Sequence, residues 1–218
     1  MIIAIDGPAG SGKSTIARII AERLKFKYIE TGSMYRAVAW EAQQKGIDPA
    51  DSERIAEVAR RLTIEFQPGP EGQRVMVDRQ DLTAELKSET IGHLAAMVAA
   101  NPVVRDILVG QQRAMGRNGN VVMDGRDIGT VVFPNADKKF FMVANRKERA
   151  RRRHEEMKEK NPDTTYERIL EQLKQRDYED ENRAVSPLVP AADAIQLDTT
   201  ELEIEEVIEA IMKALGRT

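Results

Sequence analysis

Cysteine is absent from the 218-residue chain, which excludes disulfide bonds and thiolate metal sites. Histidine is scarce as well, since His93 and His154 are the only two, and their separation gives no metal-ligand spacing. No segment reaches the roughly 18 consecutive apolar residues of a transmembrane helix. Neither a basic segment nor a long apolar stretch precedes the first apolar run at residue 2, so we expect a cytoplasmic protein that does not use a membrane.

A surplus of positive charge is also missing. The formal net charge is −3, which gives no support for a nucleic-acid partner. Hydrophobic residues make up 41% of the chain and charged residues 32%, proportions that are typical of a globular protein with one substantial core. Internal repeats are absent, and no surplus apolar helix stripe requires a partner, so we expect a monomer.

A glycine-rich segment near the start carries the clearest chemistry. It has the P-loop spacing G-x-x-x-x-G-K-S, between an apolar run at 2–5 and a helical pattern that follows. Such a turn aims backbone N–H groups inward at phosphates, beside the positive end of a helix. The predicted ATP-binding residues are Gly7, Pro8, Ala9, Gly10, Ser11, Gly12, Lys13, Ser14 and, more weakly, Thr15. Lys13 is expected at the β- and γ-phosphates, and Ser14 as a ligand of Mg²⁺.

Apolar runs alternate with helical patterns, which favours an open parallel sheet covered by helices. The predicted strands are 2–6, 27–30, 121–124, 139–143 and 194–197. The predicted helices are 13–24, 33–45, 51–61, 84–99, 102–116, 146–159, 164–181 and 201–215. The last is expected to begin with a capping box of Thr200 and Glu203 and to end at Gly216.

Residues 63–83 break this alternation and predict an inserted antiparallel sheet. Its strands are expected around Ile64 and Phe66, then Val75 and Val77, with a third at Leu82. The fold class is therefore an α/β P-loop fold of three layers, with a parallel central sheet, helices on both faces and a small inserted antiparallel sheet.

A P-loop alone names a phosphate donor, so other residues must indicate the acceptor. Arg36 and Arg126 lie in loops after predicted strands, where ligands collect in open parallel sheets. A nucleoside monophosphate needs no general base, because its phosphate is largely dianionic near neutral pH. It needs cations that offset its repulsion from the triphosphate, and planar guanidinium groups supply them. Asp124, at a strand end, is the candidate acidic partner of Mg²⁺ through water.

Six basic residues follow the strand at 139–143, within residues 145–153. A solvated helix face or an RNA-binding patch is one interpretation. We favour a mobile lid at about 146–160, in which Arg149 and Arg153 share one helix face and close over the phosphates of ATP. Arg176, Asp180 and Arg183 share another helix face, which by itself reads as a salt-bridged surface.

Together these segments resemble the bacterial cytidylate kinases, a family of nucleoside monophosphate kinases, over essentially the whole chain. The quoted stretches are residues 5–14, 31–36, 124–134 and 183–188, of which the last two are the most specific. The resemblance implies ATP-dependent phosphorylation of CMP and dCMP by direct in-line transfer. It divides the chain into a core (1–32, 117–145 and 184–218), a monophosphate-binding region at about 33–116 and the lid.

The resemblance also assigns the acceptor site. It implies that Arg36 and Arg126 hold the acceptor phosphate, and that Thr31, Arg105, Asp127 and Arg183 surround the pyrimidine, with Arg176 and Asp180 at the pentose. A carboxylate at 127 suits the cytosine 4-amino group and would repel the keto oxygen of uracil. Ala96 stands where some relatives have a serine near the sugar hydroxyls, so the preference between ribose and deoxyribose stays open. Thr31 also replaces a serine of some relatives but keeps the hydroxyl group.

Lys13, Arg126, Arg149 and Arg153 are the predicted catalytic residues, because each would neutralise charge on the transferring phosphoryl group. Other kinases of the same fold, acting on UMP, AMP or shikimate, are the nearest alternatives. A nucleotide switch without an acceptor is the alternative from another class, although the N-K-x-D element of a GTPase is absent.

Overall fold

The computed structural model describes residues 1–69, 72–158 and 163–217. Contacts within the chain divide it into two compact units, one formed by Met1–Lys27 with Asn120–Thr218 and the other by Tyr28–Gly119.

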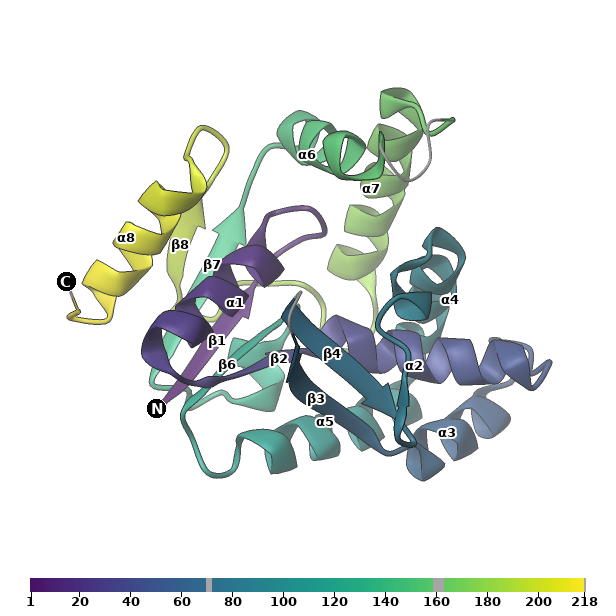
Figure 1. Ribbon diagram of the computed structural model, residues 1–218. Helices are drawn as coiled ribbons and strands as arrows, with labels where there is room; N and C mark the ends of the chain where they lie inside the picture. The colour runs from purple at the N-terminus through teal and green to yellow at the C-terminus, as the bar shows by residue number, and fades with distance from the viewer. Residues whose placement is uncertain (70–71, 159–162, 218) are drawn as a thin grey trace. The chain divides into compact units, whose positions relative to one another are not determined.

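The parallel sheet has the strand order β2-β6-β1-β7-β8 (Figure 1), and all of it except Tyr28–Glu30 of β2 belongs to the first unit. The strands are β1 (Ile2–Asp6), β2 (Lys27–Glu30), β6 (Val121–Gly125), β7 (Lys138–Val143) and β8 (Ile195–Asp198). The pairs β1–β6, β1–β7 and β7–β8 are all parallel. Ile3, Ala4 and Ile5 are fully buried, as expected for a parallel strand that is covered on both faces.

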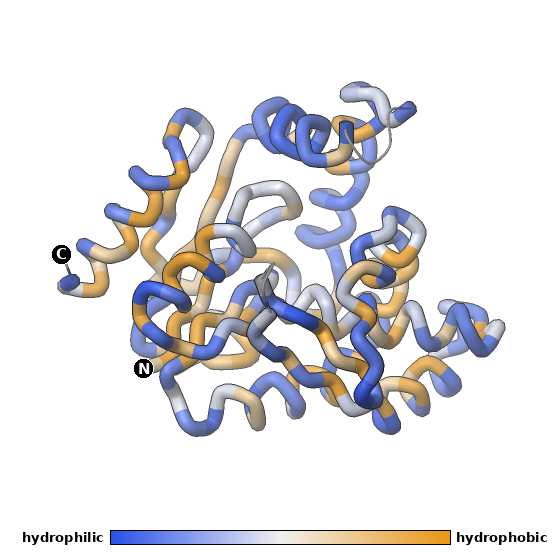
Figure 2. The backbone as a smooth tube through the Cα atoms, in the orientation of Figure 1, coloured by the Kyte–Doolittle hydropathy of each residue, from blue (hydrophilic) through white to orange (hydrophobic). Residues whose placement is uncertain are grey.

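The helices of this unit are α1 (Lys13–Leu24), α6 (Arg146–Lys158), α7 (Tyr166–Asn182) and α8 (Ile204–Ala214), with a short turn η2 (Ile128–Val132) after β6. α1 packs on β1 and β6 and beside α8. α6 packs against α7 around Ala150, Ile169 and Leu173. Figure 2 shows that α6 is mostly hydrophilic along its length, so this small cluster provides most of its apolar packing.

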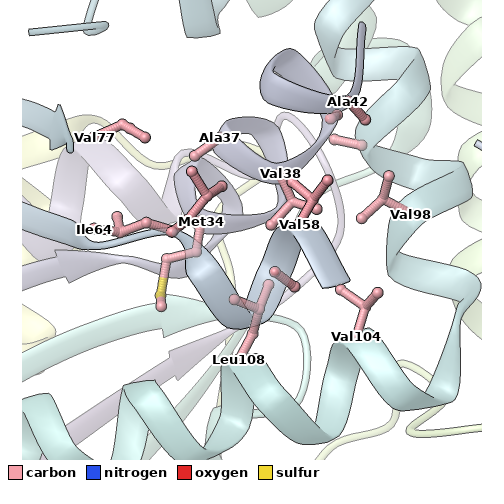
Figure 3. Close-up of a cluster of buried hydrophobic side chains, with 14 of the residues drawn as sticks. Met34, Ala37, Val38, Ala42, Val58, Ile64, Val77, Val98, Val104 and Leu108 are labelled. Carbon is pink, nitrogen blue, oxygen red and sulfur yellow. The ribbon is translucent and has the colours of Figure 1, made fainter. Parts of the chain in front are cut away.

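The second unit contains α2 (Thr31–Gln44), α3 (Ser52–Arg61), η1 (Glu85–Lys87), α4 (Glu89–Ala100) and α5 (Pro102–Gly116). It also contains the antiparallel sheet β3 (Ile64–Gly69), β4 (Gly72–Val77) and β5 (Gln80–Asp81), in that order. Figure 3 shows its core, in which Met34 and Val38 of α2, Val58 of α3, Ile64 of β3 and Leu108 of α5 gather in one buried cluster.

The structure confirms the predicted parallel sheet and the inserted antiparallel sheet, with corrections at several ends. The prediction of one helix over 84–99 is wrong, because Ser88 interrupts it and caps α4 by accepting the N–H of Ile91 at 3.3 Å. The third strand of the insert lies at Gln80–Asp81, next to Leu82 rather than on it. Residue 159 of the predicted helix and residues 159–160 of the predicted lid lie outside the described residues.

The predicted cap of the last helix is also wrong. Glu203 is the N-cap residue and Glu206 its capping-box partner, so α8 begins at Ile204. The Thr200 hydroxyl instead donates to Asp198 at 2.5 Å. Gly216 follows the helix with φ +68°, the left-handed conformation expected at a helix end.

Across residues 1–69, 72–158 and 163–217, no single helix is both long and apolar enough to cross a membrane. The pair α4 and α5 satisfies length and composition only when joined across a 99° bend.

Candidate active site

The P-loop lies between β1 and α1, and its glycines adopt conformations that side chains resist. Gly7, Gly10 and Gly12 have φ values of +154°, +75° and +83°. A Cβ at Gly7 would stand 2.2 Å from the carbonyl oxygen of Met142, so no other residue fits there. The sequence therefore folds this loop tightly against β7 and directs it into the N-terminus of α1.

Lys13 is the first residue of α1 and is almost completely buried. Its Nζ donates to the carbonyl oxygen of Pro8 at 3.0 Å, across the loop that it closes. Burial and, to a smaller extent, the positive charge of Arg126 lower the pKa of Lys13 to about 7, against the opposing effects of Asp124 and Asp180. Polyphosphate oxygens at this position would favour the charged form of the lysine.

Ser14 and Asp124 bring two oxygen ligands together. The Ser14 hydroxyl donates to Oδ2 of Asp124 at 2.8 Å, and Asp124 is buried near the end of β6. A hydroxyl beside a carboxylate fits Mg²⁺, which prefers oxygen and completes its shell with water and phosphate. Among the described residues, no group of three or more His, Cys, Asp or Glu side chains is placed to hold a metal ion.

Arg126 follows β6 directly and forms an ion pair with a residue of α7. Its Nε donates to Oδ2 of Asp180 at 2.6 Å, and Asp180 also lies 3.8 Å from Nη1 of Arg183. Burial opposes ionisation of both Arg126 and Asp180, but their mutual charges outweigh it. As a result the pKa of Arg126 is raised above its ordinary value and that of Asp180 is lowered. Arg176 adds a further positive charge near both Asp180 and Lys13.

Three of the predicted acceptor residues belong to the second unit. Arg36 lies within α2 and not in a loop as predicted, because the helix already begins at Thr31, directly after β2. Its Nη1 donates to the carbonyl oxygen of Leu86 at 2.7 Å, which connects α2 to η1. The guanidinium of Arg105 lies 5.5 Å from the ring centre of Tyr35, and its Nη1 donates to the carbonyl oxygen of Ala99 at 3.1 Å. Thr31 is buried in the first turn of α2, two residues before the predicted helix start. Lys13, Asp124, Arg126, Asp127, Arg176, Asp180 and Arg183 all belong to the first unit.

The basic helix α6 has a role that its sequence did not reveal. Arg149 is buried and forms a two-pronged pair with Asp177 of α7, at 2.8 and 2.7 Å. The same guanidinium donates to the carbonyl oxygen of Ala9 in the P-loop at 2.9 Å. Arg149 therefore contacts the backbone of the phosphate loop from the side of α6, whereas Arg153 is exposed and pairs with Glu156 at 3.0 Å. Contact of Arg149 and Arg153 with phosphate stays a prediction.

Thr199, after β8, supports the P-loop at a second point. Its hydroxyl lies 3.4 Å from the carbonyl oxygen of Ser11 and 3.2 Å from that of Val143. Arg152 of α6 donates to the hydroxyl of Thr199 at 3.3 Å, and its carboxylate partner Glu148 lies one turn earlier at 2.9 Å. The carbonyl groups of Ala9 and Ser11 in the loop are thus held by α6 and by the turn after β8.

Sequence reasoning missed Asp6, Asp177 and Thr199, all of which are buried. Asp177 lies between Arg176 and Asp180 in a charged run, where only its burial distinguishes it. Asp6 directly precedes the motif, a position that could have drawn notice because an ionised group at the end of a buried strand is costly.

Comparisons with known proteins agree over nearly the whole chain. A family model described as cytidylate kinase matches residues 3–217. The cytidylate kinase of Limosilactobacillus reuteri (strain DSM 20016) is 46% identical over 217 residues, which are 99% of this chain and 95% of the relative. That of Bacillus subtilis (strain 168) is 45% identical over 213 residues, 98% of this chain and 95% of the relative.

A solved structure of an uncharacterized protein from Eubacterium ventriosum ATCC 27560 has a TM-score of 0.54, with 12% identity, and covers 100% of this chain and 99% of its own. This likeness shows the fold alone.

The Arg149–Asp177 pair generates a stability prediction. Asp177→Asn removes the charge that compensates a buried guanidinium, so we expect the free energy of unfolding to fall by about 3–5 kcal/mol. The side chains of the pair are 5% and 4% exposed, so solvent screens it little. Chemical denaturation at pH 7 measures the loss, and Glu171→Gln on the same helix is the control, because its pair with Lys174 is exposed.

The pH dependence supplies a further check on the same pair. Burial raises the pKa of Asp177, but the hydrogen bonds from Arg149 and Arg146 lower it more, so the net value is below the ordinary one. The stabilisation is therefore present at neutral pH and is lost as the pH falls through the folded-state pKa. Equal stability of Asp177→Asn and Glu171→Gln would contradict a structural role for the pair.

Proposed function

The chain belongs to the cytidylate kinase family and is a kinase that transfers phosphate from ATP to CMP, and we propose that it also phosphorylates dCMP and does so by direct in-line transfer. The observation that carries the mechanism is the cluster of Lys13, Asp124, Arg126 and Asp180 beside the P-loop. Two polyanions can meet there because fixed cations offset their repulsion.

We propose that ATP places its phosphates on the N–H groups of residues 7–14 and at the start of α1. Lys13 would contact the transferring phosphoryl group. Its side chain is buried and its Nζ lies 3.0 Å from the carbonyl oxygen of Pro8, so the amine is already held inside the loop that would bind the phosphates. Ser14 and, through water, Asp124 would hold Mg²⁺, whose chemistry is to neutralise phosphate charge and orient the oxygens.

On the acceptor side, Arg126 would exchange part of its pairing with Asp180 for the monophosphate. Arg36 is proposed as the second phosphate ligand. Asp127 would accept a hydrogen bond from the cytosine 4-amino group. The residues proposed around the base are Thr31, Arg105 and Arg183, and those proposed at the pentose are Arg176 and Asp180. These residues are buried or half-buried, so their charges are screened less than surface charges.

We propose that α6 acts as part of a lid that excludes water during transfer. Arg149 would contribute its charge from a fixed place beside Ala9, while the exposed Arg153 would reach the phosphates only when the lid closes. A cytoplasmic monomer that binds neither nucleic acid nor membrane remains the prediction from the sequence.

Arg126→Ala tests the phosphate-clamping role. We expect kcat to fall by about 10²–10³-fold, the usual cost of removing one preorganised group that stabilises transition-state charge. Steady-state rates of ADP release with CMP measure it, and Arg18→Ala on the exposed surface of α1 is the control. Thermal unfolding should show that both variants fold, and near-normal turnover by Arg126→Ala would remove its assigned role.

Asp127→Ala tests base recognition. ADP release is measured with CMP, dCMP, UMP and AMP in parallel for both proteins. The unsubstituted enzyme should prefer CMP and dCMP, because uracil presents an oxygen to the carboxylate. Without the carboxylate, the ratio of kcat/KM for CMP over UMP should fall by about tenfold or more. An unchanged ratio would show that Asp127 does not read the base.

A further inference from the structure

Asp6 is a buried carboxylate that none of the steps above uses. It ends β1, directly before Gly7 of the P-loop, and is 5% exposed. Its Oδ1 accepts the N–H of Ile128 at 2.8 Å and its Oδ2 accepts the N–H of Gly129 at 2.7 Å. These are the two residues that follow Arg126 and Asp127 in the chain.

The two N–H groups are those at the start of η2, the turn that Asp127 precedes. Asp127 occupies the N-cap position of this turn, yet its side chain makes no cap hydrogen bond to it. Residues at an N-cap ordinarily accept such N–H groups with their own side chain. Asp6 performs that capping from β1.

Lys139 of β7 fixes the far end of the same segment. Its Nζ donates to the carbonyl oxygen of Pro134 at 2.6 Å and to Asp193 at 2.7 Å. A Cβ at Gly129 would stand 3.1 Å from Cδ of Lys139 and 3.3 Å from Oδ2 of Asp6. The segment from Arg126 to Pro134 is therefore held between two buried charged side chains and has little room to shift.

Keeping the ionised carboxylate of Asp6 in this buried position costs free energy of desolvation. The pKa of Asp6 is raised to about 7, mainly by burial and to a smaller extent by the charge of Asp127, although the N–H groups of Gly129 and Ile128 and the charge of Lys13 lower it. A residue placed only for packing would not need an ionisable group there, because an apolar side chain avoids this desolvation.

We propose that Asp6 is a positioning residue that holds the turn bearing Arg126 and Asp127 in register with the P-loop, and so sets acceptor affinity and base discrimination without touching either nucleotide. The inference rests on the proposed function of Asp127 for its effect on specificity. The register of the sheet supports it, because Asp6 pairs with Gly125, the residue before Arg126.

Asp6→Asn is the first test, because asparagine keeps the shape but replaces one acceptor oxygen with an NH₂ group that cannot accept. We expect the KM for CMP to rise about tenfold and the CMP-over-UMP ratio to fall by a similar factor, the scale of stranding one buried N–H group. The dissociation constant for ATP should change by less than about threefold, because the P-loop keeps its supports at Ala9 and Ser11.

Asp137→Asn is the matched control. Asp137 accepts the N–H of Ile2 at 2.6 Å, at the other end of β1, so it is also a carboxylate that bonds to a backbone N–H group. The Asp137→Asn variant should leave the ratio of kcat/KM for CMP over UMP unchanged. If a general weakening of the sheet were the cause, the ratio would fall in both variants, and this result would contradict a positioning role for Asp6.

Hydrogen exchange separates failure of this inference from failure of the proposed function. The amides of Ile128 and Gly129 should exchange at least about tenfold faster in Asp6→Asn than in the unsubstituted protein, while those of β1 change little. Unchanged exchange would overturn the inference whatever the kinetics show. If exchange rises and Asp127→Ala alters the ratio but Asp6→Asn does not, the positioning claim fails and base reading by Asp127 stands.

Gly129→Ala keeps the inference testable if Asp6→Asn does not fold. The added methyl group would press on Oδ2 of Asp6 and on Cδ of Lys139, so the same turn should shift. We expect the same loss of CMP-over-UMP discrimination, and a normal ratio in a folded Gly129→Ala protein would count against the inference.

Discussion

The pairing of buried charges around the P-loop is the constraint on which the first unit depends. Lys13, Arg126 and Arg149 are cations with little access to water, and each has carboxylates or carbonyl groups placed to compensate it. An unpaired buried charge costs a large free energy of desolvation, so these side chains need compensating partners to stay charged in the folded protein. The network then presents positive charge to a polyphosphate without reorganising at the moment of transfer.

The same network joins the donor loop to the residues proposed for the acceptor. α7 supplies Asp177 to Arg149, which bonds to the P-loop, and three residues later supplies Asp180 to Arg126. β1 supplies Asp6 to the turn after Arg126 and then continues into the P-loop. A displacement of the P-loop is therefore connected, through these hydrogen bonds and ion pairs, to the residues proposed for the acceptor.

Local signals predicted most of the fold. The strands of the parallel sheet were predicted to within one residue of their ends. For β1, β6 and β7 the reason is that strands buried on both faces form continuous apolar runs. The errors lie where two local signals compete. Helical periodicity continued through Ser88, but its cap ended one helix and began another. Thr200 was predicted as the cap with Glu203 as its capping-box partner, but the Thr200 hydroxyl bonds to Asp198 and Glu203 is itself the N-cap.

The candidate site likewise contains residues that the sequence could predict and contacts that only the structure shows. The P-loop is a contiguous motif, so its residues could be selected from their spacing, and Asp124 from its place at a strand end. The hydrogen bond between Ser14 and Asp124 was not predicted and comes from the structure. Arg149–Asp177 and Asp6–Gly129 join residues far apart in the chain, and only the packing of α6 on α7 and of β1 beside β6 brings them together. A sequence shows that such charges exist, but the partner of each is set by tertiary structure.

The titration of Lys13 tests the account most directly, because a buried lysine poised among fixed charges is its central claim. Two-dimensional NMR of lysine Cε–Hε signals, assigned with Lys13→Arg, can follow the pKa with and without nucleotide. We expect a pKa of about 7 for Lys13 in the nucleotide-free protein, rising above about 9 when ATP brings phosphate oxygens to the amine. A pKa near 10.5 without nucleotide, unchanged by ATP, would contradict the account.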